Sequence, residues 1–203
     1  MQAAFIDIGS SRNGFLQIND IHPTYFLKKN KNNKSSKSRH RNFPNIQDVL
    51  EPEQELVVQV VKDERDAKGA TLTTNLSIPG RFLVLMIGSQ KGGVSRKISD
   101  EAQRKKLKSS ISNLVVPPGM SVIVRTAGID KSSEELQKDL DALVEQWKKI
   151  LKDSFKKENP TLLYEEGDLL TRAIRDYLRD SFDEILVDKK ETFEKVHLSL
   201  IHI

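Results

Sequence analysis

The chain has 203 residues, no cysteine and a net charge of +4, and this composition excludes several classes of protein. Without cysteine there are neither disulfides nor thiolate metal sites, which suits a reducing cytosol. No apolar run approaches the roughly 20 residues that a membrane-spanning helix needs, and the first residues lack the basic start and apolar core of a signal peptide. We therefore expect a cytoplasmic, globular protein without a transmembrane segment.

Positive charge is concentrated in the middle of the sequence. Residues 75–130 carry 9 Lys or Arg against 3 Asp or Glu, whereas residues 131–203 carry 13 against 17. Residues 1–74 carry 11 against 9, and seven of those bases lie in Lys28–Arg41, which has no acidic residue and predicts an irregular loop. A basic middle segment is either a solvated surface or a binding face for a polyanion, and charge alone leaves both interpretations open.

The first half of the chain is predicted to form short strands. The apolar runs Ala4–Ile8 and Gly14–Ile18 flank a glycine- and serine-bearing turn and predict two neighbouring strands. Pro79-Gly80 predicts a break in the chain. Three further strands are expected, at Leu56–Lys62, Gly69–Leu76 and Arg81–Met86.

The second half of the chain is predicted to be mainly helical. A basic helix is expected over Asp100–Asn113, and the longest helix over Ser132–Lys157. Ser132 and Glu135 have the spacing of a capping box. Apolar residues recur at helical spacing along the long helix and predict one buried stripe: Leu136, Leu140, Leu143, Val144, Trp147, Ile150, Leu151 and Phe155.

Three shorter elements complete the prediction. A strand is expected over Ser121–Arg125, a helix over Asp168–Arg179 and a last strand over Ser181–Asp188, followed by a short helix. Residues 197–203 fit no element well and are left out of the prediction.

The strand that ends at Val124 runs directly into Arg125, Thr126 and Gly128, and a helix is predicted to begin shortly afterwards. Backbone N–H groups in such a turn and at a helix start attract anions, and a guanidinium adds two parallel donors. The turn therefore predicts either an anion site or an ordinary structural turn before a helix. The pattern by itself does not separate the two.

Phe5 and Phe15 lie on the two predicted strands near the start of the chain. If both rings are exposed on a small sheet, they form a platform on which unpaired bases stack; if they are buried, they belong to the core. Lys68 follows a charged turn and precedes Gly69, so it is placed to reach a phosphate beside such a platform. Both interpretations of the phenylalanines stay open.

Patterns for catalysis and metal binding are weak. The four histidines have no ligand spacing, and Asp7 stands alone in an apolar strand. The sequence contains no nucleophile with an adjacent base, no P-loop and no dinucleotide fingerprint. We predict no catalytic residue and no metal ligand in this chain.

Seven blocks, in order along the chain, resemble the bacterial ribonuclease E/G family. Those similar to the family's RNA-binding barrel are Ala3–Gly9, Asn13–Leu16 and Lys68–Thr74. Those similar to its 5′-sensor region are Pro79–Met86, Gly93–Ile98 and Val122–Gly128. The block Arg172–Leu178 is similar to the start of the family's ribonuclease-H-like subdomain.

The resemblance implies an α+β chain in three parts. Residues 1–74 would form an OB-fold-like β-barrel whose first strand is missing, because about four of the five strands of such a barrel are visible. Residues 75–170 would form an α/β 5′-sensor region, and residues 171–203 part of the ribonuclease-H-like subdomain.

The resemblance also implies roles for individual residues. Those expected to grip single-stranded RNA are Phe5, Phe15 and Lys68. Those expected to hold a 5′-monophosphate are Arg125 and Thr126, in a pocket lined by Gly80 and Val84.

By this resemblance the partner is single-stranded RNA with a 5′-monophosphate, and the process is RNA processing and decay. The family's full-length protein is a magnesium-dependent endoribonuclease with a structural zinc and is expected to be a homo-oligomer. The catalytic carboxylates and paired cysteines of that protein have no counterpart in this chain, so we expect it to bind RNA without cutting it. The alternatives are a stand-alone, non-catalytic RNA-binding module and an enzyme for a small phosphorylated metabolite, although the second lacks any catalytic cluster.

Overall fold

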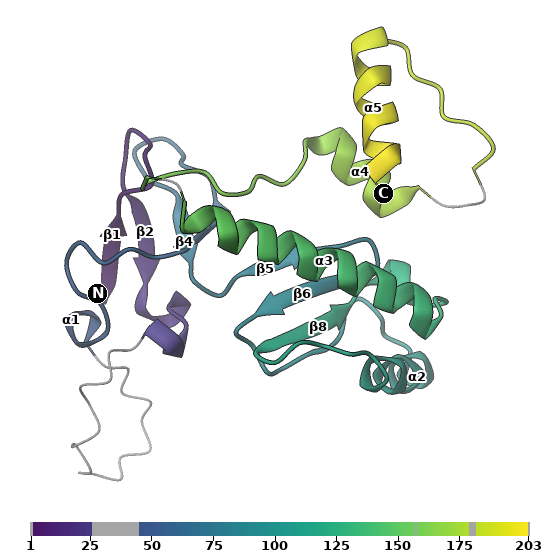
Figure 1. Ribbon diagram of the computed structural model, residues 1–203, viewed down its shortest axis with the longest axis horizontal. Helices are drawn as coiled ribbons and strands as arrows, with labels where there is room; N and C mark the ends of the chain where they lie inside the picture. Colours follow the sequence, from purple (N-terminus) through teal and green to yellow (C-terminus); the bar gives the residue numbers. More distant parts are fainter. Residues whose placement is uncertain (1, 26–44, 157, 179–181, 203) are drawn as a thin grey trace.

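The computed structural model describes residues 2–25, 45–156, 158–178 and 182–202, which form a mixed α+β fold. In this part of the chain, two four-stranded sheets and five α-helices are present (Figure 1). The predicted loop Lys28–Arg41 lies outside the described residues. None of the described helices is both long and apolar enough to cross a membrane.

The first sheet has the strand order β1-β2-β4-β3. Its strands are β1 (Ala3–Ile6), β2 (Gly14–Gln17), β3 (Gln59–Lys62) and β4 (Thr71–Thr73). Only β2 and β4 run parallel. The side chains of Leu16 in β2 and Leu72 in β4 are fully buried in the core on one face of the sheet. The short helix α1 (Ile46–Val49) contributes Val49 to the same core. Among the described residues the sheet is open, with β1 and β3 at its edges, and no closed barrel is formed.

The second sheet has the order β5-β6-β8-β7. Its strands are β5 (Ser77–Pro79), β6 (Leu83–Ile87), β7 (Gly93–Val94) and β8 (Met120–Val124). The predicted break at Pro79-Gly80 is confirmed, because β5 ends at Pro79 and a turn over residues 80–82 leads into β6. The sequence pattern predicted no strand over Ser77–Pro79; β5 is an edge strand, which does not need the missing proline N–H. Gly93, which reads as a turn residue, instead pairs in parallel with Ile123.

Helices α2 (Glu101–Ser112) and α3 (Ser133–Ser154) cover one face of the second sheet. In β6 and β8, alternate residues such as Leu83 and Val124 are fully buried against these helices. The residues between them, including Val84 and Ile123, therefore point to the opposite face. Figure 1 shows α3 lying along the sheet.

The predicted capping box of α3 is confirmed. The Ser132 hydroxyl accepts a hydrogen bond from the Glu135 N–H at 3.2 Å, and the Glu135 carboxylate accepts one from the Ser132 N–H at 3.0 Å. Trp147 packs against the core, as its position on the apolar stripe predicts. Leu151 and Phe155 are exposed, contrary to prediction, because the core beneath α3 ends at Ile150.

Helices α4 (Leu169–Tyr177) and α5 (Lys190–His202) contact each other near the end of the chain (Figure 1). The strand predicted over Ser181–Asp188 is not formed: residues 182–188 are irregular, Leu186 is 85% exposed, and Ser181 lies outside the described residues. Residues 197–202 belong to α5 although the sequence pattern left them unassigned.

Candidate functional site

The first sheet carries an exposed aromatic pair. Phe5 and Phe15 are directly opposite each other in the β1–β2 ladder, and their ring centroids are 5.9 Å apart at an interplanar angle of 57°. Because Leu16 points into the core, Phe15 faces the other way and is half-buried, while Phe5 is 72% exposed. The alternative in which both rings belong to the core is therefore excluded by Phe5.

Lys68 lies in a turn that packs against the turn between β1 and β2. Its N–H and carbonyl both bond to Arg65, and the Arg12 guanidinium donates to the Asp66 carbonyl. A Cβ at Gly69 would lie 2.1 Å from the Asn13 carbonyl oxygen, so only glycine permits this approach. Lys68 is exposed and forms no ion pair with a described residue. The structure thus brings Lys68 to the same end of the sheet as the aromatic pair.

The predicted anion turn lies at the end of β8, in the second sheet. The Arg125 N–H donates to the Phe82 carbonyl at 2.8 Å, and a short 3-10 helix follows over Thr126–Gly128. Thr126 is exposed, and among the described residues its hydroxyl and N–H, like the N–H of Ala127, have no hydrogen-bond partner. These groups are free to bind an anion from solvent.

The Arg125 guanidinium, in contrast, is already bonded within the chain. Its Nη1 donates to the Gly80 carbonyl at 2.5 Å, and its Nη2 lies 2.8 Å from Oδ2 of Asp176 in α4. The side chains of Arg125 and Asp176 are 23% and 28% exposed, so this ion pair is partly buried. A carboxylate of the chain therefore occupies the position in which a guanidinium would hold a phosphate oxygen.

Arg175 completes a network of two arginines and two carboxylates. Its Nε lies 2.9 Å from Oδ1 of Asp176, and its Nη1 lies 2.6 Å from Oε1 of Glu166. Burial would raise the pKa of Asp176, but hydrogen bonds from Arg125 and Arg175 outweigh it and hold that pKa below its ordinary value. Burial would likewise lower the pKa of Arg175, but its two carboxylate partners raise it. Both shifts favour the charged forms of Asp176 and Arg175.

Asp139 in α3 positions the turn that carries the Gly80 carbonyl, the other hydrogen-bond partner of Arg125. Its carboxylate accepts hydrogen bonds from the N–H groups of Arg81, Phe82 and Leu83, at 3.2, 3.0 and 2.9 Å. A Cβ at Gly80 would lie 2.7 Å from Oδ2 of Asp139, so this turn requires glycine. Sequence reasoning missed Asp139; the signal was a carboxylate three residues after Leu136, within the apolar stripe.

The predicted site residues thus fall into two groups. Gly80 and Arg125 are in direct contact. Val84 pairs with Ile123 across β6 and β8, and strand alternation places it on the open face of the second sheet with Arg125. The residues of the other group are on the first sheet: Phe5, Phe15 and Lys68.

The part of the chain that the structure describes holds no group of three His, Cys, Asp or Glu side chains that could bind a metal ion. The two carboxylates of the arginine network, Asp176 and Glu166, are each paired with arginine. The described residues therefore do not fit the magnesium or zinc that the family resemblance implies, and no metal-dependent step is assigned to them.

Exposed aromatic rings on a small sheet, with a free cation beside them, are features shared by proteins that bind single-stranded nucleic acid. Comparison with known proteins is more specific. A family model described as the Ribonuclease E/G family matches residues 77–202. The chain therefore belongs to the ribonuclease E/G family, as the sequence blocks predict.

Three relatives illustrate the similarity. Ribonuclease E of Haemophilus influenzae is 44% identical over 99% of this chain and 21% of that protein. Ribonuclease E of Escherichia coli K12 is 43% identical over 96% of this chain and 18% of that protein. Ribonuclease G of Escherichia coli K12 is 35% identical over 96% of this chain and 38% of that protein. The chain thus spans about a fifth of the length of the two ribonuclease E relatives.

Among solved structures, the Staphylococcus aureus RNase P protein matches 36% of this chain at 19% identity. The TM-score of 0.28 is too low to indicate a shared fold.

Proposed function

We propose that this chain is the RNA-recognition portion of a ribonuclease E/G-type endoribonuclease. The observation that carries the proposal is the exposed Phe5 ring in contact with Phe15, on a sheet whose turn presents Lys68. Unpaired bases stack on such rings, and each stacked base contributes about 1–3 kcal/mol. Residues 1–74 are proposed to act as the OB-fold-like RNA clamp, with the described sheet as part of that fold.

The second part of the proposal is that the Arg125 turn binds a 5′-monophosphate. A terminal phosphomonoester carries up to two charges and three acceptor oxygens, which suit a guanidinium, a hydroxyl and free N–H groups. The Thr126 hydroxyl and the N–H groups of Thr126 and Ala127 are free for this purpose. Residues 75–170 would form this sensor, with Gly80 and Val84 beside the phosphate.

Asp176 must be accommodated in this proposal. A phosphate that takes the Nη2 donor of Arg125 has to replace the Asp176 carboxylate there, while Nη1 keeps its bond to the Gly80 carbonyl. Asp176 would not be left unpaired, because Arg175 still holds its other oxygen at 2.9 Å. Binding of the RNA end would thus exchange one ion pair for another and loosen α4 from the sensor.

Substitution of Arg125 tests the sensor assignment. Arg125→Ala should weaken binding of a 5′-monophosphorylated RNA by about 1.5–3 kcal/mol, since a charge-assisted pair is lost. Binding of the same RNA with a 5′-hydroxyl should change little. Fluorescence anisotropy with both RNAs gives the two affinities, and Arg65→Ala, which removes an exposed arginine of the turn between β3 and β4, is the matched control. Equal weakening for both RNA ends would refute the sensor assignment.

In the whole protein, we propose that recognition by this portion places a downstream phosphodiester in a magnesium-dependent catalytic site, in a homo-oligomeric enzyme. Residues 171–203 would contribute to the ribonuclease-H-like subdomain. For this chain we expect RNA binding without cleavage. Incubation of a labelled single-stranded RNA with the purified chain and magnesium checks this. Cleavage activity that co-purifies with the chain would contradict the expectation.

A further inference from the structure

A second cationic region lies beside the Arg125 turn, because the Ser95 N–H donates to the Val124 carbonyl at 2.9 Å. It is formed by the loop before and after β7 and by the outer face of α2, and we call it the basic surface. Its members are Lys91, Arg96, Lys97, Lys105, Lys106 and Lys108, all of them exposed. None forms an ion pair with a carboxylate in the described residues.

Helix α2 fixes half of this surface. Leu107 is 2% exposed and anchors the helix in the core of the second sheet, so the lysines on either side of it point outward. The helix begins at Asp100, whose carboxylate caps the Gln103 N–H at 2.7 Å. The acidic residues Asp100 and Glu101 are confined to this end of the helix, where negative charge stabilises the helix dipole.

Arg104 joins the loop to the helix. Its Nη1 donates to the carbonyls of Ser95 and Ile98, at 2.8 and 2.9 Å. The guanidinium of Arg104 is thus already bonded, and its contribution is to hold the segment that carries Arg96 and Lys97 against α2. The backbone that carries Arg96 and Lys97 is therefore held against α2, and binding does not have to order this segment first.

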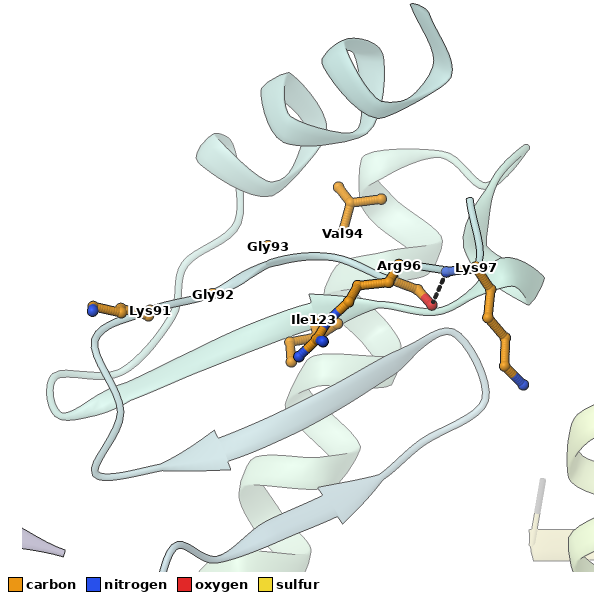
Figure 2. A pocket seen from close by; sticks show the side chains of 8 residues that line it. Lys91, Gly92, Gly93, Val94, Arg96, Lys97 and Ile123 are labelled. Atoms are coloured by element: carbon orange, nitrogen blue, oxygen red, sulfur yellow. Dashed lines mark hydrogen bonds between the residues drawn. The ribbon is translucent and has the colours of Figure 1, made fainter. Parts of the chain in front are cut away.

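The loop also borders a cavity of about 340 Å³ on the open face of β8. Lys91, Arg96, Lys97 and Ile123 line it (Figure 2). Figure 2 shows Arg96 extending toward Ile123, with Lys91 and Lys97 at opposite ends of the segment. A Cβ at Gly92 would lie 2.6 Å from the Val122 carbonyl, so glycine lets the loop follow the strand closely.

The composition of this surface indicates what it can recognise. Residues 88–116 contain no aromatic side chain, so bases cannot stack here as they can on Phe5 and Phe15. Five of its six cations are lysines, which act as point charges on phosphate and do not read base edges bidentately. The ligand chemistry that fits is therefore a run of phosphodiesters, independent of base sequence.

We propose that the basic surface is an additional RNA-binding site, which holds the phosphodiester backbone of a segment away from the 5′ end. The inference rests on the proposed function, because it takes RNA as the polyanion. It adds a contact that depends on neither the aromatic pair nor the Arg125 turn. Binding at this surface extends the length of RNA that the chain contacts and makes affinity more sensitive to salt.

The test replaces the three lysines of α2 together, as Lys105→Gln, Lys106→Gln and Lys108→Gln. The matched control removes three exposed lysines from α3: Lys138→Gln, Lys149→Gln and Lys152→Gln. Both variants lose the same charge, and circular dichroism verifies that both retain helix. Affinity is measured over a series of KCl concentrations for two RNAs with 5′-hydroxyl ends, one unstructured and one a hairpin.

For the α2 variant, the slope of log affinity against log salt should become shallower by about 2, because three phosphate contacts are lost and each contributes about 0.7 for a single strand. The control should keep the slope of the unsubstituted chain. A change with the unstructured RNA alone identifies an unpaired segment as the ligand, and a change with the hairpin alone identifies a paired one.

Two results would overturn the inference. An unchanged slope in the α2 variant contradicts the basic surface while leaving RNA recognition by the aromatic pair intact. An equal change of slope in the α3 control would show that the effect depends only on the net charge of the chain. Failure of the unsubstituted chain to bind either RNA would instead contradict the proposed function itself.

Discussion

Asp176→Asn is the substitution that most directly probes the Arg125 site. Asparagine has the shape of aspartate but removes the charge that lies 2.8 Å from Nη2 of Arg125 and 2.9 Å from Nε of Arg175. If Asp176 competes with a 5′-phosphate for Arg125, its neutralisation should tighten binding of 5′-monophosphorylated RNA. The same substitution should not change binding of RNA with a 5′-hydroxyl, beyond the effect of one added positive charge.

The size of the effect follows from the geometry. A charge-assisted hydrogen bond contributes about 1.5–3 kcal/mol net, and a phosphate that displaces Asp176 forfeits that bond. Arg175 keeps its own bond to Asp176, so only the contact with Arg125 is lost and the lower end of this range applies. We therefore expect about 1.5 kcal/mol, which corresponds to slightly more than tenfold tighter binding.

Fluorescence anisotropy with paired 5′-phosphate and 5′-hydroxyl RNAs measures the effect. Glu145→Gln is the control for net charge, because Glu145 is an exposed carboxylate of α3 whose one ion pair with a described residue is to Lys148. The reasoning is refuted if Asp176→Asn leaves the ratio of the two affinities unchanged. A selective loss of phosphate binding would show instead that Asp176 orients Arg125 for its ligand.

Three further predictions concern the aromatic pair and two carboxylates of α3. Phe15→Ala should weaken RNA binding by about 1–3 kcal/mol whatever the 5′ end, because base stacking does not involve the terminal phosphate. Phe155→Ala, which removes a ring that is 82% exposed at the end of α3, should leave RNA binding unchanged. Asp139→Ala should lower the free energy of unfolding by about 2–4 kcal/mol in urea titrations, because three backbone N–H groups lose their acceptor. A loss no larger than that of Asp141→Ala would contradict this role. The Ser132 N–H and Lys131 lower the pKa of Glu135 from 4.5 to about 2, so its stabilisation is complete above pH 4.5 and is lost as pH falls toward 2. Thermal unfolding of the unsubstituted chain and of Glu135→Gln should therefore differ at pH 6 and converge near pH 2.

Local sequence patterns were sufficient for most elements of this protein. The helical spacing of Leu136, Leu140 and Leu143, with the capping box at Ser132, determines α3 without reference to the rest of the chain. Alternation likewise locates β6 and β8, since one face of each strand must be buried. Errors occurred where pairing partners decide the outcome. Ser77–Pro79 form a strand that was not predicted, because they pair at the edge of the second sheet, and residues 182–188 have strand-like composition but form no strand.

Residue types and their order along the chain also indicated the family, because the blocks around Phe5, Lys68 and Arg125 are local sequence features. What those side chains contact depends on residues far away in the sequence, so no local pattern could reveal it. The Arg125 turn reads as a free anion site, yet folding brings Asp176 from 51 positions later onto its guanidinium. Asp139, in α3, likewise holds the turn that presents the Gly80 carbonyl. The distinction is physical: propensity and periodicity act between near neighbours, whereas ion pairing and the exposure of a ring are set only when distant elements pack together.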